Sequence, residues 1–284
     1  MVNIGVIGYG FVGRATGEGF ASSKKNKVFW FDKFKESPYS LEEVVENSEY
    51  IFICVPTPIF EDYSGMDMSI VEGVIEEISP KVKGTDKIVI IKSTSLPGTN
   101  KKMSKKYPGI NFVMNPEFLT QKFANRDFLN PARTVIGSES RDVADRIVNI
   151  YKTILPKNQP YIITDVTSAE VIKYMSNLML ATKIIIANDL YTFSKAVGAN
   201  YIDVQRGVES DPRIGTHLGV PGSDGLMGFG GACFPKDTIG ILGLAKKLKV
   251  DMSALQAVWD KNLKIRKTRD WEEMPQAFKK KDIK

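Results

Sequence analysis

The amino-acid sequence predicts an α/β chain in which a doubly wound sheet is followed by an all-helical domain built on one long helix. Over the first half of the chain, short apolar runs alternate with helical segments, which is typical of parallel strands joined by helices. Near residue 167 the pattern changes to a long helical stretch without Pro or Gly. The length of 284 residues, at about 150 residues per domain, also predicts two domains. We place them at 1–163 and 164–270 and expect a frayed polar tail at 271–284.

The first domain is predicted element by element from its apolar runs. Strands are expected at residues 2–7, 28–31, 49–55, 87–91, 110–114 and 134–136, and helices at 11–22, 69–78 and 138–150. Because strands and helices alternate, we expect a parallel sheet that is covered by helices on both of its faces.

The second domain is predicted to begin with one helix over residues 167–197, about 45 Å long at ~1.5 Å per residue. This helix is apolar on most of its circumference, notably at 178–181 and 184–187. A helix that is apolar nearly all round is buried on several sides, so we expect it to pack on both domains and on a second copy, forming a homodimer. Further helices are expected at 201–208, 235–248 and 253–267, with a glycine-rich loop at 215–234.

Composition excludes several classes of protein. Hydrophobic residues make up 43% and charged residues 25% of the chain, so it is neither disordered nor fibrous. The net charge of +6 is modest and the lysines are scattered, which favours a solvated face over a nucleic-acid stripe. Two cysteines and one histidine leave no disulfide framework and no metal site built mainly from these residues. Because the chain lacks a signal-peptide pattern and any run of about 18 apolar residues, we expect a soluble cytoplasmic protein that binds no membrane. With so few cysteines and histidines, we also expect no metal cofactor.

A glycine-rich turn stands between the first predicted strand and the first predicted helix. Residues 8–13, Gly-Tyr-Gly-Phe-Val-Gly, fit the spacing G-x-G-x-x-G, in which glycines let the backbone approach a pyrophosphate held by the helix N-terminus. Asp32 closes the second predicted strand, where a carboxylate binds the ribose hydroxyls. Because that carboxylate repels a 2′-phosphate, NAD is favoured over NADP, although Lys33 beside it weakens this argument. The first domain is therefore predicted to be a Rossmann-type, NAD-binding domain.

A second motif surrounds Cys233, in the sequence Gly-Phe-Gly-Gly-Ala-Cys-Phe-Pro-Lys-Asp at residues 228–237. The glycines are expected to allow the close approach of a ligand, and Pro235 suits the first turn of the following helix. A thiol here lies near the positive end of that helix and near Lys236, and both favour the nucleophilic thiolate. We therefore predict that Cys233 is reactive, and that Cys54, inside an apolar strand, is a small buried hydrophobe.

Other polar residues stand where chemistry is expected. Lys173 and Asn177 are four residues apart in the long helix, so they project from one face, unless they form a polar stripe that reaches solvent. Glu117, in Asn-Pro-Glu-Phe-Leu, and Thr94 each follow a predicted strand, where open α/β sheets bind ligands. Helix capping or a surface role would also explain these two residues. His217 is interpreted as a loop residue and not as a base.

Taken together, these motifs resemble those of the UDP-glucose/GDP-mannose dehydrogenase family, in the family's order and over nearly the whole chain. The motifs are residues 8–13, 55–58, 93–94 with 97–99, 115–119, Lys173 with Asn177, 211–215 and 229–237. The resemblance implies an NAD-dependent, four-electron oxidation of a nucleotide sugar from a primary alcohol to a carboxylate, with two NAD reduced. UDP-glucose is the expected substrate, while the nucleotides of mannose and N-acetylmannosamine stay open.

The residues suit this chemistry. Lys173 and Asn177 can stabilise the negative charge that develops on the alcohol oxygen as the hydride leaves. The Cys233 thiolate can add to the resulting aldehyde to give a thiohemiacetal, and a second hydride transfer gives a thioester that water cleaves.

The resemblance assigns further roles by position. Proton handling is shared by Glu117, Asp237 and a water held by Thr94. The cofactor contacts are Gly8, Gly10, Phe11, Val12, Gly13, Asp32, Lys33, Val55, Pro56, Thr57 and Thr94. The substrate contacts are Phe118, Leu119, Lys173, Asn177, Arg213, Phe229, Gly230 and Gly231, with Arg213 reaching across the dimer.

Two departures from the family's pattern are visible. A second carboxylate that many members carry after Asn-Pro-Glu is replaced here by Gln121, which affects the proton relay that it serves. Family members usually continue into a third domain that helps to hold the nucleotide base. We expect this shorter form to hold the base weakly, or through its partner subunit or its tail.

Two other functions stay open. A two-electron dehydrogenase of the β-hydroxyacid type also joins a Rossmann domain to a helical one and uses a Lys with an Asn four residues later, but it has no need of Cys233. A non-catalytic, NAD-binding regulatory protein is the other alternative. The joint presence of the cysteine with Lys173, Asn177, Glu117 and Asp237 argues against it.

Overall fold

Residues 1–280 are described by a computed structural model, and they fold as two compact units. The first unit consists of residues 1–57 and 68–173, and the second consists of 58–67 and the chain from 174 onward. This division falls inside the long helix and differs from the predicted boundary at residue 163. It also assigns to the second unit a short excursion, residues 58–67, from the first half of the sequence.

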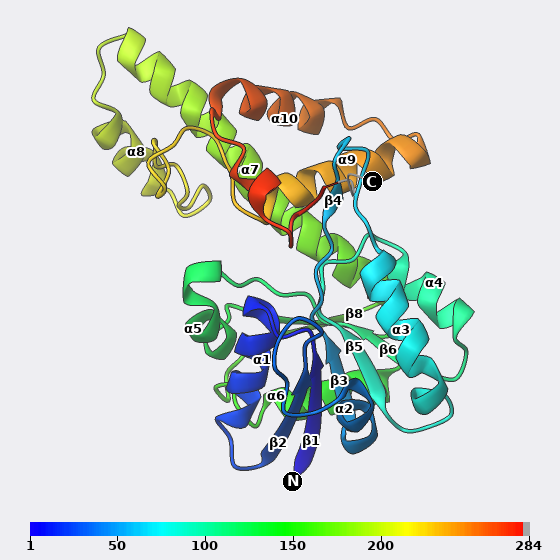
Figure 1. Cartoon of the computed structure of the whole chain (residues 1–284). Helices are drawn as coiled ribbons and strands as arrows, with labels where there is room; N and C mark the ends of the chain where they lie inside the picture. The colour runs from blue at the N-terminus through cyan, green and yellow to red at the C-terminus, as the bar shows by residue number, and fades with distance from the viewer. Residues whose placement is uncertain (281–284) are drawn as a thin grey trace. The chain divides into compact units, whose positions relative to one another are not determined.

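The first unit contains one sheet of seven strands in the order β2-β1-β3-β5-β6-β7-β8 (Figure 1). The strands are β1 (Val2–Ile7), β2 (Asn26–Phe31), β3 (Tyr50–Ile53), β5 (Ile88–Ile91), β6 (Asn111–Met114), β7 (Thr134–Gly137) and β8 (Tyr161–Thr164). From β2 to β6 they run parallel, with Ile4 of β1 opposite Val28 on one side and Tyr50 on the other. All except β8 confirm predicted strands, and β8 escapes prediction because none of its residues is fully buried.

Strands β7 and β8 run against the other five, which corrects the expectation of a wholly parallel sheet. The one ladder pair between β6 and β7, Met114 with Gly137, is antiparallel. The cause is the connection, because residues 115–133 form only the 3-10 turn η1 (Gln121–Phe123) and the short helix α5 (Ala124–Leu129). Without a crossover helix, the next strand starts at the edge where β6 ends and must run back.

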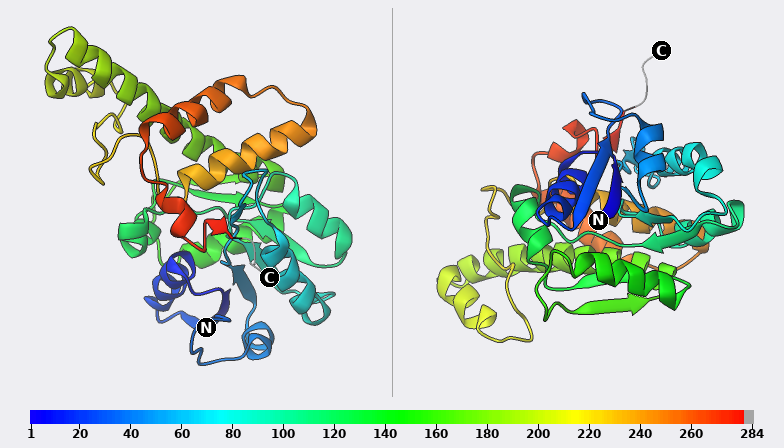
Figure 2. Two further views of the ribbon diagram at one scale, coloured as in Figure 1. Left: turned by 45° about the horizontal axis from the view of Figure 1, so that its top comes forward. Right: turned by 90° about the horizontal axis from the view of Figure 1, so that it is seen from below.

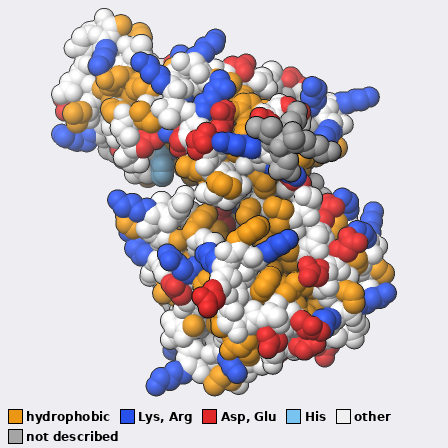
Figure 3. All heavy atoms as spheres, viewed as in Figure 1, with side chains coloured by type: hydrophobic (Ala, Val, Ile, Leu, Met, Phe, Trp, Pro, Cys, Tyr) orange, Lys and Arg blue, Asp and Glu red, His pale blue; other side chains and the backbone are white. Residues whose placement is uncertain are grey.

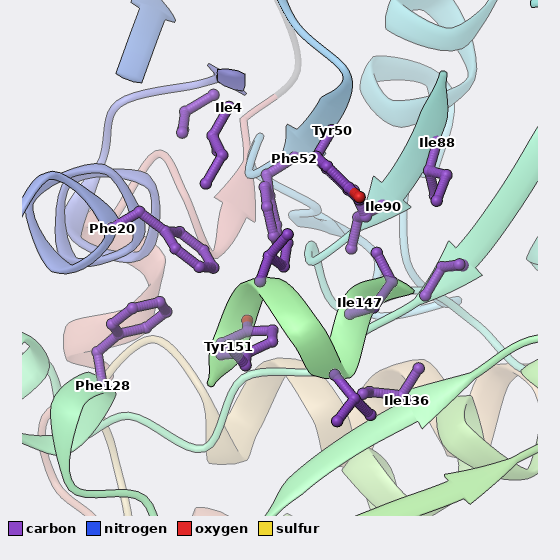
Figure 4. Packing of buried hydrophobic residues seen from close by; sticks show 14 of the residues in the cluster. Ile4, Phe20, Tyr50, Phe52, Ile88, Ile90, Phe128, Ile136, Ile147 and Tyr151 are labelled. Carbon is purple, nitrogen blue, oxygen red and sulfur yellow. The ribbon is translucent and has the colours of Figure 1, made fainter. Parts of the chain in front are cut away.

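Helices cover both faces of this sheet. On one face lie α1 (Phe11–Ala21), α5 and α6 (Arg141–Tyr151), and on the other lie α2 (Leu41–Asn47), α3 (Ser69–Val82), α4 (Thr99–Lys106) and the start of α7 (Val166–Ala196). Alternate residues of a strand face opposite cores, so Phe52 of β3 lies in one and Ile51 in the other. Figure 4 shows Phe20, Phe128 and Tyr151 gathered near Phe52. The predicted doubly wound architecture is confirmed.

Helices α2, α4 and α5 have no counterpart in the sequence-based prediction. All three are short, and α4 carries mostly polar residues, so they show no clear amphipathic pattern. The start of α2 did carry a local signal, since Ser40 and Glu43 form a capping box. The Glu43 N–H donates to the Ser40 hydroxyl at 3.2 Å, and the Ser40 N–H donates to the Glu43 carboxylate at 2.7 Å.

The second unit is mainly helical. It contains the rest of α7 together with α8 (Tyr201–Glu209), α9 (Phe234–Leu248) and α10 (Ser253–Ile265), close to the predicted bounds. Helices α9 and α10 lie beside each other (Figure 2). The core of the unit joins Ala181 of α7, Ile239 of α9 and Trp259 of α10 with Ile59 of the excursion. None of the helices within residues 1–280, α7 included, combines the length and the apolarity needed to cross a membrane.

The expectation of a frayed tail is wrong for residues 271–280. Trp271 lies in the 3-10 turn η2 (Asp270–Glu273) and is completely buried. Phe278 begins the short strand β9 (Phe278–Lys279), which pairs in parallel with β4 (Ile59–Phe60) of the excursion. The burial of Trp271 and Phe278 could not be predicted, because they stand in a lysine-rich segment and β9 pairs with a strand that is far away in the sequence. The rest of the predicted tail, 281–284, lies outside the described residues.

Candidate functional site

The glycine turn at residues 8–13 joins β1 to α1, as predicted. Gly8 has a φ of +87°, and a Cβ atom on Gly13 would lie 1.9 Å from the Gly8 carbonyl oxygen, so both positions require glycine. Gly10 is the N-cap of α1, no side chain caps this helix, and its first turn holds no acidic residue. The N–H groups and the dipole at this helix end therefore fit the pyrophosphate of a dinucleotide.

Asp32 follows β2, and its carboxylate is held by backbone groups of two segments. Oδ2 accepts from the Tyr9 N–H at 2.6 Å, and Oδ1 accepts from the Phe34 N–H at 2.9 Å. The Tyr9 ring stacks on Trp30, with the ring centroids 4.1 Å apart. These contacts bind the glycine turn to the end of β2, where a carboxylate suits the ribose hydroxyls. Lys33 beside the carboxylate is exposed.

The predicted cofactor contacts after β3 and β5 lie in two loops that touch. The Ser93 hydroxyl donates to the Val55 carbonyl at 2.7 Å, which joins the loops at the carboxyl edge of the sheet. Thr57 and Thr94 are buried, and Pro56 is exposed. Phe11 and Val12 are half-buried in the first turn of α1.

Glu117 and Lys173 form a buried ion pair in the first unit. Lys173 Nζ donates to Glu117 Oε1 at 2.7 Å, and their side chains are 7% exposed for the glutamate and 3% for the lysine. Glu117 Oε2 accepts from the Leu119 N–H at 2.7 Å. Burial raises the pKa of Glu117, but the Lys173 ammonium, the Leu119 N–H and Lys92 together outweigh burial, so this pKa lies below its ordinary value. The alternative of a polar stripe that reaches solvent is therefore wrong for Lys173.

A second buried lysine, Lys92, lies in the first unit and belongs to none of the predicted motifs. Lys92 Nζ donates to Asn115 Oδ1 at 2.9 Å and to the Tyr151 hydroxyl at 3.3 Å, and that hydroxyl donates to Asn115 Oδ1 at 2.6 Å. Burial lowers the pKa of Lys92 to about 8. A cavity of about 220 Å³ opens here, lined in part by Lys92, Glu117 and Arg133. The position of Lys92 directly after the apolar run of β5 is the feature of the sequence that indicates its burial at the edge of the sheet.

Cys233 is the N-cap of α9 in the second unit, with Pro235 in the first turn, as predicted. The cysteine is half-buried, whereas Cys54 is buried in the sheet core, where burial raises the pKa of its thiol to about 12. Cys54 thereby confirms its predicted role as a small buried hydrophobe. The two cysteines therefore stand in contrasting surroundings.

Asp237 lies one turn after Cys233 and is 1% exposed. Its Oδ2 accepts from Asn177 Nδ2 at 2.6 Å, and its Oδ1 accepts from Lys236 Nζ at 2.6 Å. The Lys236 ammonium, expected beside the thiol, is thus engaged by the neighbouring carboxylate. Asn177, which binds Asp237, lies in the part of α7 that belongs to the second unit.

The remaining predicted residues have simpler surroundings. The Arg133 guanidinium lies over the Phe118 ring, 4.2 Å from its centroid. The side chain of Arg213 is 87% exposed and pairs with Asp211 at 2.6 Å. Gln121 is exposed in η1, and His217 lies in an exposed loop, which confirms its interpretation as a loop residue.

Two domains of a single family match this chain. The NAD binding domain of the UDP-glucose/GDP-mannose dehydrogenase family matches residues 33–155, and the central domain of that family matches residues 167–264. The chain belongs to the UDP-glucose/GDP-mannose dehydrogenase family. The first match covers most of the sheet and its helices, and the second covers most of α7 to α10.

Named relatives agree with the family. The UDP-glucose 6-dehydrogenase of Rickettsia felis is 34% identical over 222 residues, which cover 77% of this chain and 48% of that protein. The UDP-glucose 6-dehydrogenase TuaD of Bacillus subtilis is 34% identical over an alignment of 304 positions, which covers 94% of this chain and 64% of that protein. The chain thus spans about half the length of the Rickettsia felis protein.

Solved structures of dehydrogenases share the fold. The structure of a UDP-glucose dehydrogenase from the hyperthermophilic archaeon Pyrobaculum islandicum has a TM-score of 0.82 at 29% identity, covering 93% of this chain and 68% of that one. A UDP-D-ManNAc dehydrogenase from Pyrococcus horikoshii has a TM-score of 0.78 at 23% identity, covering 93% and 69%, and supports the fold alone. This chain therefore shares its architecture, a sheet followed by a long helix, with a solved UDP-glucose dehydrogenase.

Proposed function

We propose that this chain catalyses the NAD-dependent, four-electron oxidation of a nucleotide sugar, with UDP-glucose as substrate and UDP-glucuronate as product. The observation that carries the proposal is the setting of Cys233, at the N-cap of α9 and one turn before the buried Asp237. A dehydrogenase that stops after two electrons has no use for such a thiol. The names of the relatives, UDP-glucose 6-dehydrogenases, support the choice of sugar.

NAD is the proposed cofactor and, when bound, accepts the hydride. The glycine turn and the N-terminus of α1 would hold its pyrophosphate, and Asp32 would bind its ribose hydroxyls. The other proposed contacts are Phe11, Val12, Lys33, Val55, Pro56, Thr57 and Thr94.

In the first oxidation, a hydride leaves the primary alcohol carbon and an aldehyde forms. Lys173 and Asn177 stabilise the negative charge on the alcohol oxygen, as ammonium and amide donors. The hydroxyl proton passes through a water held by Thr94 to the Glu117 carboxylate, which its lowered pKa keeps ionised before the reaction.

In the second oxidation, the Cys233 sulfur forms a bond to the aldehyde carbon, giving the oxyanion of a thiohemiacetal, and the thiol proton passes to Asp237. A second hydride leaves this carbon and a thioester results. One water then breaks the carbon–sulfur bond, which releases the carboxylate and returns the thiol. Phe118, Leu119, Arg213, Phe229, Gly230 and Gly231 are the further proposed substrate contacts.

The NADH released per molecule of sugar tests this proposal, measured with UDP-glucose, GDP-mannose and UDP-N-acetylmannosamine. We expect two NADH per UDP-glucose, and we expect Cys233→Ser to lose acid formation by about a thousandfold, since it lacks the covalent step. Cys54→Ala is the matched control and keeps the stoichiometry. One NADH per molecule with a fully active Cys233→Ser variant would establish the two-electron alternative, and NAD binding without any turnover would establish the non-catalytic one.

We also propose that the chain forms a homodimer through α7. A stripe of exposed apolar side chains runs along the part of this helix in the second unit and reaches the residue just past its end: Met175, Met179, Ile186, Leu190, Phe193 and Val197. Spacings of four, seven, four, three and four residues place them on one face of the helix. Figure 3 shows apolar side chains gathered over the end of α7 and over α8, where Ile202 is 65% exposed. Such a contiguous stripe is typical of an interface between copies.

A further inference from the structure

The backbone of the cysteine loop, residues 228–233, is held by polar side chains from α7, α10 and η2. Three of its N–H groups donate to such side chains: Gly228 to Asn188 Oδ1 at 3.1 Å, Phe229 to Asn262 Oδ1 at 2.8 Å, and Gly231 to Asp270 Oδ2 at 2.8 Å. Asn262 Nδ2 also donates to the Phe229 carbonyl at 3.0 Å, so this amide binds the loop in both directions. Asn188 and Asn262 are almost completely buried.

Two glycines of the cysteine loop make room for these side chains. A Cβ atom on Gly228 would lie 2.4 Å from Asn262 Oδ1. A Cβ atom on Gly230 would lie 2.3 Å from both the Arg266 guanidinium and the Asp270 carboxylate. At such distances an added Cβ atom would displace the Asn262, Arg266 or Asp270 side chain, so these glycines serve the contact between the loop and the residues that hold it. This role adds to the predicted one, in which the same glycines allow a ligand to approach.

Arg266 is a buried charge at the end of α10, with its side chain 2% exposed. It donates to Asp270 Oδ1 at 2.9 Å, to Asp224 Oδ2 at 2.7 Å and to the Thr268 carbonyl at 3.2 Å. A buried guanidinium is stable only while its carboxylate partners stay in place. Asp270 is thus fixed between Arg266, through one oxygen, and the Gly231 N–H, through the other.

We propose that Asn262, Arg266 and Asp270 are positioning residues that set the backbone of the cysteine loop and so hold the Cys233 thiol in one place at the N-cap of α9. This inference rests on the catalytic role proposed above for Cys233. Gly231, which Asp270 binds, lies two residues before the cysteine, so a shift of its backbone moves the thiol. Arg266 and Asp270 lie beyond residues 167–264, the range that matches the central domain of the family.

Asp270→Asn tests the proposal with a nearly isosteric change. The amide offers one acceptor oxygen to two donors and removes a counter-charge of Arg266, so the loop loses one of its bonds. We expect kcat for NADH release to fall at least about tenfold, because small misplacements of a reacting group are costly. The KM for NAD should stay within about twofold, since the proposed cofactor residues lie in the first unit. Glu273→Gln, an exposed carboxylate of the same segment paired with Lys280 at 3.0 Å, is the matched control and should keep both constants.

Alkylation of the thiols by iodoacetamide gives a readout that does not depend on turnover. Labelling of the folded full chain, mapped to each peptide by mass spectrometry, should be at least about threefold faster at Cys233 in Asp270→Asn than in the wild type, because the loop opens more often. Cys54 should stay unlabelled in both, which shows that the sheet remains folded. Equal rates at Cys233 in the wild type, Asp270→Asn and Glu273→Gln would overturn the proposal. A faster rate in a chain that oxidises none of the sugars would keep the positioning role and remove the proposed function.

A double-mutant cycle with Gly230→Ala tests the packing directly. The added methyl group collides with Arg266 and Asp270, so the single variant should lower kcat and speed the labelling of Cys233. In the double variant with Asp270→Ala, the missing carboxylate frees space for the methyl group. The combined change in kcat, expressed as a free energy, should therefore be smaller than the sum of the two single changes. Strictly additive effects would mean that Gly230 does not serve this contact, which would contradict the packing argument.

Discussion

The Lys173 ammonium and the Glu117 carboxylate are bonded at 2.7 Å, with neither side chain more than 7% exposed. Removing one partner of a buried pair costs about 3–5 kcal/mol, because the other charge is left without compensation. We therefore expect Lys173→Met to lower the free energy of unfolding by about that amount at neutral pH, measured by urea denaturation. The double variant with Glu117→Gln should recover most of the loss. Lys106→Met, which removes an exposed pair with Glu76, is the control, and an equal effect of both lysine variants would contradict this prediction.

Lys92 should make stability depend on pH in the alkaline range. Burial lowers its pKa to about 8, from 10.5. Below pH 8 the ammonium is charged in both the folded and the unfolded state, and the cost of burying it is fully present. Between pH 8 and 10.5 the folded amine is neutral while the unfolded one still binds a proton, so this cost is relieved. The stability of the wild type relative to Lys92→Met should thus rise by roughly 2–3 kcal/mol from about pH 7 to about pH 10. A difference independent of pH would show that burial does not perturb this lysine.

Asp32 should contribute to cofactor affinity. Its carboxylate is fixed by the N–H groups of Tyr9 and Phe34, so its orientation is set before any ligand binds. We expect Asp32→Ala to weaken NAD binding at least about tenfold, the loss of one or two hydrogen bonds to a charged group, as measured by calorimetry. Glu36→Ala, an exposed acidic residue four positions later, serves as the control. An unchanged dissociation constant in Asp32→Ala would refute the assignment.

The apolar stripe on α7 should control the oligomeric state. A charged residue in the centre of an apolar interface is left buried and unpaired, so Met179→Glu and Phe193→Glu should each sediment as monomers at micromolar concentration, where the wild type sediments as a dimer. Leu248→Glu, at an exposed apolar residue of α9, should leave the dimer intact. A wild-type chain that sediments only as a monomer would remove the proposal.

Trp271 should be a major source of stability in the second unit. The ring is completely buried against Trp259, with centroids 5.6 Å apart. Large-to-small changes of this kind cost about 3–5 kcal/mol, so Trp271→Ala should lower the melting temperature of the chain by several degrees. Phe34→Ala, at a residue that is 90% exposed, should leave the melting temperature unchanged. Equal melting temperatures for the two variants would restore the interpretation of this segment as a loose tail.

Much of the fold could be predicted because it depends on local pattern. The strands around Ile51 and Ile90 are short runs of apolar residues, and α7 is a long stretch without helix breakers, so periodicity alone reveals them. The reversed strand β7 and the pairing of β4 with β9 are set by the length of a connection and by contacts between distant segments. Such features leave no mark in a window of neighbouring residues.

The candidate site divides along the same line. Residues whose chemistry depends on a motif, such as Asp32 and Cys233, could be predicted from the sequence. Lys92, Arg266 and Asp270 are ordinary charged residues in their local context, and only their burial and their partners in space distinguish them. Sequence therefore identifies groups that react or bind, whereas the groups that hold them in place emerge from the folded chain.

The pairing of β4 with β9 joins two segments that are synthesised far apart in time. Ile59 leaves the ribosome early, yet the strand that pairs with it begins only at Phe278. The sheet of the first unit has all its strands once β8 is complete, so it can form while the second unit still lacks a strand of its core. Closing so long a loop is slow. During translation, Ile59 therefore stays without its partner strand until Phe278 has been made, and an apolar strand without a partner is prone to aggregation.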